Sequence, residues 1–481
     1  MMKKIIKNRF LTCFILPLVL SCNAFAVDLN EAIVVHSSLK HYPKIYNSEE
    51  KIRIAEAKLT EARGEFDSKL NIKQKQFLSG YYKDYGYLES KLVKPIGFLN
   101  ANLYSGYTLS QNGVYPEVNN YYNTGTDGRA LFGFEFSILR GFLINERIAA
   151  NKIAKIESGL SNLSNKLVVA QVKNDARKSY WKFFYLRKIL NLYEEQLDIA
   201  KKRNESIAQQ VKNGDKPKIA QEESFRVVLR RMSLLENIKR EYFSSAVSLS
   251  LYLRDNGGNI GNPEEIIDFN LTDEDFVNSF NFDTIDISKD YVALNRLDVL
   301  MAKEIIKQGD VRIKLVQNDI LPSVDFVFET SMDYGSVALE KRDRLNKIGV
   351  NISIPIENKK QIGKYSKVKS ENKILKNDLK FLQDTIKSEL NNMEAKIKEL
   401  KEVFVNTGQE VVISKNLLDA EIERFNQGDS DFFLLNAREQ DFLFVNDYHL
   451  RVKLALVEVL IEYLFATKDS VCQVVENNCF E

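Results

Sequence analysis

Three histidines and four cysteines are the residues of this 481-residue chain most able to bind a metal ion or act as a nucleophile. His36, His41 and His449 lack the His-Glu-x-x-His spacing of a zinc site, and no cysteine lies close to the first two in sequence. There is also no Gly-rich phosphate loop and no nucleophile elbow. We therefore predict no catalytic residue, no metal site and no cofactor, and expect that the protein is not an enzyme.

The cysteines are better explained by export. A basic start, an apolar run over 10–20 and the Ala24-Phe25-Ala26 motif indicate a bacterial signal peptide, residues 1–26, cleaved after Ala26. A second interpretation stays open, because residues 19–22 resemble a lipoprotein box in which Cys22 becomes a lipid anchor. Cys472 and Cys479 would then lie in an oxidising compartment, where they form either a disulfide or two free thiols.

The charge balance excludes one class of partner. The chain has 68 Lys and Arg against 66 Asp and Glu, so electrostatics gives no reason to expect nucleic-acid binding. After the signal, no stretch approaches the ~20 apolar residues that a membrane helix requires. Any insertion into a membrane must therefore use strands.

An internal repeat indicates the fold. Three motifs recur in the same order in the two halves of the chain, and each half reads helix, strand, strand, helix, turn, helix. The first copy has about 39 extra residues between its two strand motifs. The matched pairs are 66–68 with 321–323, 132–138 with 348–354 and 211–215 with 425–429.

The strand motifs alternate apolar with small or polar residues, as in 132–138 and 348–354. This pattern suits a half-buried soluble sheet as well as a membrane strand. The helical stretches favour the second interpretation. Residues 141–211 and 358–427 lack proline and would each extend about 100 Å. Gly214 and Gly428 then fold these helices back on 217–254 and 430–467.

The apolar residues of the long helices recur every three or four positions, which predicts a seam against a partner helix. They are Ile153, Ile156, Leu160, Leu163 and Leu167 in the first copy, and Leu375, Leu379, Leu382, Ile386, Leu390, Met393, Ile397 and Leu400 in the second. Four strand motifs per chain cannot close a membrane barrel, which needs about eight strands. The strands must therefore be pooled among several copies, with the helical hairpins forming a long bundle beside them.

Over nearly all of the mature chain, the sequence resembles the TolC family of outer-membrane factors. The resemblance lies in residues 29–32, 57–64, 321–323, 424–428 and 435–438. It implies a mainly α fold with membrane β-strands, in which a homotrimer forms a twelve-stranded barrel in the outer membrane and a long periplasmic α-helical barrel. It also implies an exit duct for efflux or type I secretion, with a periplasmic adaptor and an inner-membrane transporter as partners.

The resemblance assigns the glycine turns to the periplasmic tips, where the adaptor binds and the entrance closes. The residues implied there are Gly214, Asp215, Gly428, Asp429, Asp431, Phe433 and Asn436. Phe433 and Asn436 stand where some family members have carboxylates that form a cation-binding ring. Two interpretations stay open: either Asp429 and Asp431 line the mouth instead of that ring, or Ser430 or Asp431 merely caps the last helix.

The domain scheme follows from the repeat. The extra residues of the first copy, rich in tyrosine, form interface girdles, a surface loop or additional strands. The scheme is a signal at 1–26, a first repeat at 27–254 (strands about 66–140, hairpin 141–254), a linker at 255–287, a second repeat at 288–468 (strands about 321–356, hairpin 358–467) and a tail at 469–481.

Two other classes remain as alternatives. A periplasmic adaptor is exported and has a helical hairpin, but it has one hairpin between small β domains. An envelope scaffold built on coiled coils has no use for the apolar strands 132–138 and 348–354.

Overall fold

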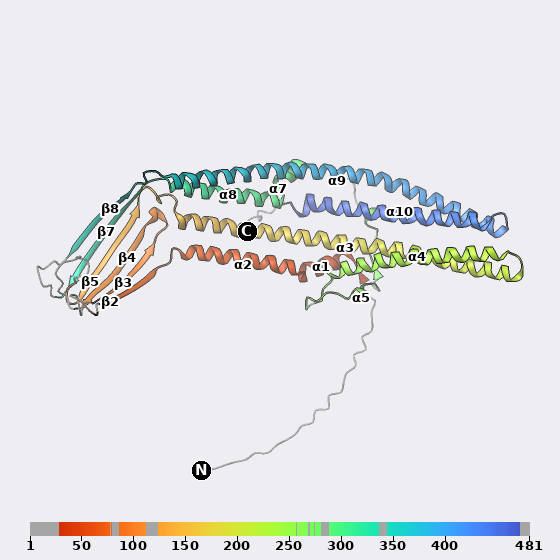
Figure 1. Ribbon diagram of the computed structural model, residues 1–481, viewed down its shortest axis with the longest axis horizontal. Coiled ribbons are helices and arrows are strands. Elements are labelled where there is room, and N and C mark those ends of the chain that lie inside the picture. Colours follow the sequence, from red (N-terminus) through yellow and green to blue (C-terminus); the bar gives the residue numbers. More distant parts are fainter. Residues whose placement is uncertain are drawn as a thin grey trace, which may run out of the picture.

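A computed structural model of the chain describes residues 28–76, 78, 86–111, 124–255, 257–267, 270–273, 275–279, 288–335 and 344–471. The molecule is elongated, with long helices running from a sheet at one end to two hairpin turns at the other (Figure 1). The predicted signal peptide, Cys22, Cys472 and Cys479 lie outside the described residues.

The helices confirm the duplication. The first copy contains a 68-residue helix followed by one of 33 residues, and the second copy contains helices of 69 and 33 residues. The long helices are α1 (Glu31–His41), α2 (Pro43–Gly64), α3 (Glu146–Asn213), α4 (Lys218–Ser250), α8 (Leu297–Asn318), α9 (Lys359–Gln427) and α10 (Phe432–Leu464). The shorter helical segments are η1 (Phe98–Asn100), α5 (Pro263–Ile267), α6 (Phe276–Ser279), α7 (Lys289–Asn295) and η3 (Phe465–Asp469).

Local signals fix where the hairpin helices begin and end. The side chain of Asn145 caps α3 by accepting a hydrogen bond from the Ile148 amide at 2.9 Å. For this reason α3 begins at Glu146, five residues after the Gly141 expected from the sequence. Both α3 and α9 end at a glycine with φ +87°, Gly214 and Gly428, a conformation that costs a glycine little.

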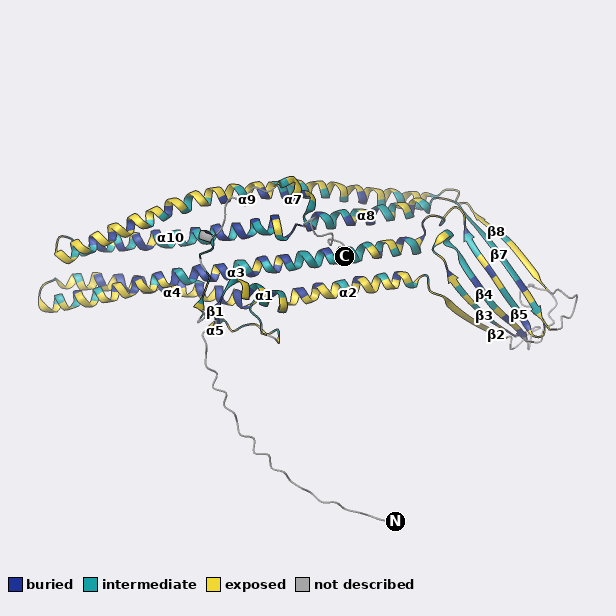
Figure 2. Ribbon diagram, turned by 180° about the vertical axis from the view of Figure 1, so that it is seen from behind, coloured by how far each residue is buried: buried dark blue, intermediate teal, exposed yellow. Residues whose placement is uncertain are grey.

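The helices form a wall that is one layer thick. Near the sheet, α2 packs on α3, α3 on α8 and α8 on α9. Toward the turns, α4 packs on α3, α3 on α10 and α10 on α9. The predicted seam is present, since Leu163, Ile386, Leu390 and Ile397 are buried. The part of the wall toward the turns is called the lower wall. Its two outer helices, α4 and α9, are exposed along much of their length (Figure 2).

The main sheet has six strands in the order β2-β3-β4-β5-β7-β8, all antiparallel. They are β2 (Lys69–Gln76), β3 (Gly86–Pro95), β4 (Asn102–Gln111), β5 (Gly128–Ser137), β7 (Ser323–Tyr334) and β8 (Leu345–Ser353). The four expected strand motifs correspond to β2, β5, β7 and β8. The sheet has six strands, two more than the four matched motifs, so of the alternatives left open for the extra residues the additional strands are confirmed. The extra residues of the first copy form the additional hairpin β3–β4.

A small region girdles the middle of the wall. There β1 (Asp28–Leu29) pairs in parallel with β6 (Asn270–Leu271), so the start of the described chain lies beside the segment that joins the two repeats. Asp273 accepts a hydrogen bond from the Glu31 amide at 2.6 Å, which caps the start of α1. The aromatic side chains of Tyr180, Phe183 and Tyr185 on α3 are fully buried there.

Among the described residues, no helix combines the length and apolar character needed to cross a membrane.

Candidate channel wall and hairpin tips

The sheet has one apolar face and one polar face. Residues that pair across neighbouring strands lie on the same face, so the register assigns each residue to one of the two. Following the register outward from Phe134 gives an apolar set on every strand. Ile348 in this set is 77% exposed, so nothing else in the described chain covers the face at that edge. The apolar set includes Leu70, Ile72, Leu88, Leu92, Leu103, Tyr107, Leu109, Phe132, Phe134, Phe136, Phe326, Phe328, Ile348, Val350 and Ile352.

The opposite face is polar and cross-linked between strands. Its charged residues are Lys69, Lys73, Lys75, Glu89, Lys91, Arg129, Glu135, Asp325, Glu329, Asp333 and Lys347. Arg129 on β5 makes two hydrogen bonds of 3.0 Å to the Asp333 carboxylate on β7. The Ser137 hydroxyl donates to Asp325 at 2.6 Å. A face of this kind suits contact with water, and the apolar face suits contact with lipid.

The two tips lie together at the end far from the sheet (Figure 1). The Lys216 ammonium of the first tip lies 5.0 Å from the centre of the Phe425 ring at the end of α9. This contact joins the two hairpins. A Cβ atom added at Gly214 or Gly428 would meet no atom within 4 Å, so the positive φ, and not crowding, accounts for glycine at these positions.

The other predicted tip residues differ in their surroundings. Asp215 and Asp429 are exposed, and Phe433 is 79% exposed. Asp431 caps α10 by accepting a hydrogen bond from the Leu434 amide at 2.8 Å, as the alternative interpretation expected. Asn436 is half-buried, and its Oδ1 atom accepts no hydrogen bond from the described residues. The tip therefore presents carboxylates and the large apolar side chain of Phe433 to solvent.

A buried ionic cluster behind the tips was not found from the sequence. The Glu439 carboxylate on α10 pairs with Arg203 on α3 and, at 2.6 Å, with Arg231 on α4. Glu439 and Arg231 are both buried, and the Arg231 guanidinium also donates to the Gln196 carbonyl at 2.7 Å. One carboxylate thus ties both helices of the first hairpin to the second. No sequence signal links these residues, because Arg231 and Glu439 are 208 positions apart.

A second unpredicted cluster attaches the segment between the repeats to the wall. Asp275 accepts hydrogen bonds from Tyr185 at 2.5 Å and Lys453 at 3.0 Å. Burial alone would raise the pKa of Asp275, but these hydrogen bonds outweigh burial and hold the pKa below its usual value. Nearby, Glu31 pairs with Arg177 and accepts a hydrogen bond from Trp181 at 2.7 Å.

The histidines are not gathered into a site. His449 stacks on Phe404, with ring centres 5.2 Å apart, and its Nδ1 atom lies 2.8 Å from the Thr407 hydroxyl. Burial, and then the charge of Lys453, lower the pKa of His449. In the described part of the chain, no group of three or more His, Cys, Asp or Glu is placed to hold a metal ion.

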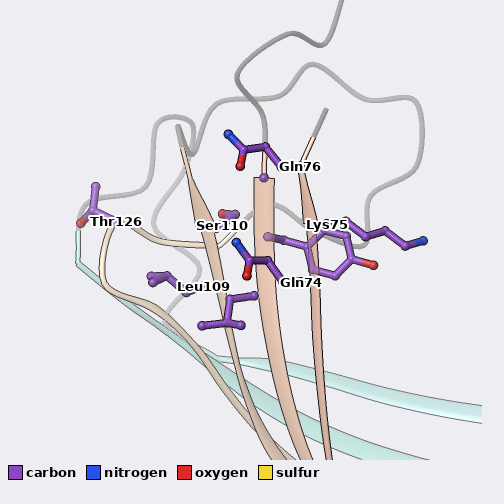
Figure 3. A pocket seen from close by; sticks show the side chains of 9 residues that line it. Gln74, Lys75, Gln76, Leu109, Ser110 and Thr126 are labelled. Atoms are coloured by element: carbon purple, nitrogen blue, oxygen red, sulfur yellow. The ribbon is translucent and has the colours of Figure 1, made fainter. Parts of the chain in front are cut away.

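A hollow of about 450 Å³ lies at the ends of β2, β3 and β4 farthest from the helices (Figure 3). Its described lining contains one charged residue, Lys75, and no acid, histidine or cysteine. It therefore offers no acid–base pair. The lining residues are Gln74, Lys75, Gln76, Gly86, Tyr87, Leu88, Leu109, Ser110 and Thr126.

Comparison with known proteins gives a match at the level of structure. No family model and no curated protein sequence matches the chain. The Campylobacter jejuni CmeC outer membrane channel matches with a TM-score of 0.67 and 12% identity, over 92% of this chain and 86% of that one. CusC, described as forming a transmembrane channel, gives 0.66 and 13%, over 92% and 93%. This chain has the fold of these channels.

The likeness spans nearly the whole length of both chains. The Neisseria gonorrhoeae MtrE outer membrane channel, solved in its open state, matches with a TM-score of 0.59 and 15% identity, over 92% of each chain. The fold predicted from the sequence is therefore confirmed, with β3 and β4 as the additional strands of the first copy.

Proposed function

We propose that this protein is an outer-membrane exit duct of a tripartite efflux pump or type I secretion system. The observation that carries the proposal is the sheet, apolar on one face and polar on the other, at one end of a helical wall about 100 Å long. The likeness to solved outer membrane channels supports it. The sheet then lies in the outer membrane of a Gram-negative bacterium, and the helices lie in the periplasm.

The duct is a homotrimer in this proposal. Both outer helices of the lower wall expose apolar side chains at helical spacing, including Phe225, Leu229 and Met232 on α4. On α9, Val412 is 60% exposed and Ile413 59%. Neighbouring copies bury these residues when α4 of one chain packs against α9 of the next. Burial of apolar surface supplies the driving force for such assembly.

The partners are a periplasmic adaptor and an inner-membrane transporter, and the hairpin tips are where the adaptor binds and the entrance closes. Exposed carboxylates and Phe433 at the turns support this assignment. The proposed tip residues are Gly214, Asp215, Gly428, Asp429, Asp431, Phe433 and Asn436. The domain scheme, the signal peptide, the choice between Ala26 cleavage and a Cys22 anchor, and the pairing of Cys472 with Cys479 remain predictions.

Fractionation tests the proposal. The protein is expected in the outer-membrane fraction as an oligomer that resists SDS, and the purified protein is expected to conduct ions in planar bilayers. A periplasmic adaptor or a scaffold would give neither result. A water-soluble monomer without conductance would refute the proposal.

The tip assignment has its own test. Asp431→Ala and Phe433→Ala are expected to change the conductance or its gating, because both residues lie at the proposed entrance. Unchanged conductance in both variants would reject the assignment but leave the exit duct standing.

A further inference from the structure

We propose that the hairpin β3–β4 widens the membrane pore, so that three copies of this chain close an eighteen-stranded barrel as wide as the helical tunnel below it. This inference rests on the proposed function and specifies the pore. Its cargo class is hydrophilic solutes too large for a twelve-stranded barrel. Barrels of 16–18 strands leave an open aqueous channel.

The hairpin is an integral part of the wall. Strand β3 pairs with β2 over eight residues and with β4 over ten, so both neighbours are held along their length. Strand β4 continues the register onto β5. Both faces continue through the hairpin: the apolar face carries Leu88, Leu92, Leu103, Tyr107 and Leu109, with Ser90 and Ser105 among them and Lys94 at the end near the helices. A surface loop would not keep this alternation.

One row of side chains connects the hairpin to β5 of the first repeat and β7 of the second. Tyr104 on β4 pairs with Gly133 on β5, and Gly133 pairs with Glu329 on β7. The Tyr104 ring lies across Gly133, where an added Cβ would come within 2.5 Å of it, and its hydroxyl donates to Glu329 at 3.1 Å. The Lys91 ammonium lies 3.7 Å from the centre of the same ring. The polar face is therefore built around the extra strands.

The turn of the hairpin is also held by the helical wall. Asn145, the residue that caps α3, donates from its side chain to the Gly97 carbonyl at 3.4 Å. Arg147 in the first turn of α3 donates to the Asn102 side chain at 3.1 Å. The hairpin thus spans from the start of the helices to the far end of the sheet.

The width of the sheet matches the width of the helical wall. Strands that are about 4.8 Å apart and tilted by about 40° occupy about 38 Å of circumference when there are six, and about 25 Å when there are four. Four helices, α2, α3, α8 and α9, occupy about 32–40 Å at their usual spacing. Six strands per chain therefore continue the helical tunnel without a narrowing, whereas four would taper it.

The two edges of the sheet suit closure by further copies. Within the described residues, β2 and β8 are each paired on one side only, and both are largely exposed (Figure 2). Unpaired backbone groups are not tolerated in lipid. Strand β2 runs away from α2 and β8 runs back toward α9, so β8 of one copy meets β2 of the next in antiparallel order. Six strands in one chain are too few to close alone.

Deletion of residues 86–111 tests the inference. Removing both strands of the hairpin leaves β2 free to pair directly with β5, which keeps the antiparallel order and gives four strands per chain. The cross-section scales with the square of the strand number, so it falls about 2.25-fold. We expect a lower single-channel conductance, and a smaller size limit for polyethylene glycols added on the barrel side. Tyr104→Phe keeps both strands and is the matched control, with an expected wild-type size limit.

Strand counting in the wild-type oligomer by electron cryomicroscopy makes the test independent of how the deletion variant folds. Eighteen strands are expected. Twelve strands from two copies, or equal polymer size limits in wild type and deletion variant, would overturn the inference but leave the exit duct intact. A protein that forms no channel at all would overturn both.

Discussion

The buried cluster of Glu439, Arg203 and Arg231 gives the sharpest prediction about stability. Glu439→Gln keeps the shape of the side chain but removes the one negative charge between two guanidinium groups, and Arg231 is only 4% exposed. Breaking a buried ion pair by removing one partner costs about 3–5 kcal/mol. An unfolding entropy of roughly 2.1 cal/mol/K per residue amounts to about 1 kcal/mol/K for this chain. The melting temperature is therefore expected to fall by about 3–5 °C.

The assay is thermal unfolding followed by the helical circular-dichroism signal. Glu236→Gln is the matched control, because Glu236 pairs with Lys239 at 2.8 Å on the exposed side of α4. An exposed pair contributes about 0–1 kcal/mol, so this variant is expected to melt within about 1 °C of wild type. Replacing Glu439, Arg203 and Arg231 together by Met, Met and Leu is expected to recover the loss in melting temperature. A Glu439→Gln variant that melts like the control would refute the reasoning.

Three further predictions concern pH, the tips and the sheet. Because the pKa of His449 is lowered in the fold, acidification below about pH 6.5 should lower the melting temperature of wild type. His449→Phe should lose less between pH 7.5 and 6, and an equal fall of the melting temperature in both proteins would contradict the burial argument. Gly214→Ala and Gly428→Ala should each lower the local stability of the turn by about 1–2 kcal/mol, measured as faster amide exchange at the tips. Asn in either position should cost less. Unchanged exchange would show that the turn relaxes. Gly133→Val should displace the Tyr104 ring and lower the stability of the sheet by about 1–3 kcal/mol in urea unfolding, and a neutral result would mean that the ring moves freely.

The sequence was sufficient for features that depend on local chemistry. Glycine at both turns, the seam through Ile386 and Leu390, and the repeated order of elements all follow from periodicity and backbone preference, and the structure confirms them. The predicted start of α3 was less accurate. Gly141, with φ +91°, ends the strand region, and the cap at Asn145 begins the helix.

Features that depend on distant partners could not be predicted. The hairpin β3–β4 alternates like its neighbours, but its tyrosines suit a girdle or a loop equally well until the pairing of Tyr104 with Gly133 is known. The cluster at Glu439 depends on which faces of three helices meet, which periodicity along any one helix does not determine. The same holds for Asp275 and its contact with Lys453.

The single-layer wall has a consequence for how the protein is made. Within the described residues, no second layer covers the apolar positions of α4 and α9, and no strand pairs with the outer edges of β2 and β8. In the proposed oligomer, sister molecules supply part of the free energy that holds the chain in shape, which makes its stability depend on protein concentration. If the protein is an outer-membrane duct, as proposed, its chains expose these strand edges in the periplasm before they assemble, so a chaperone that binds the edges is expected to raise the yield of assembled protein.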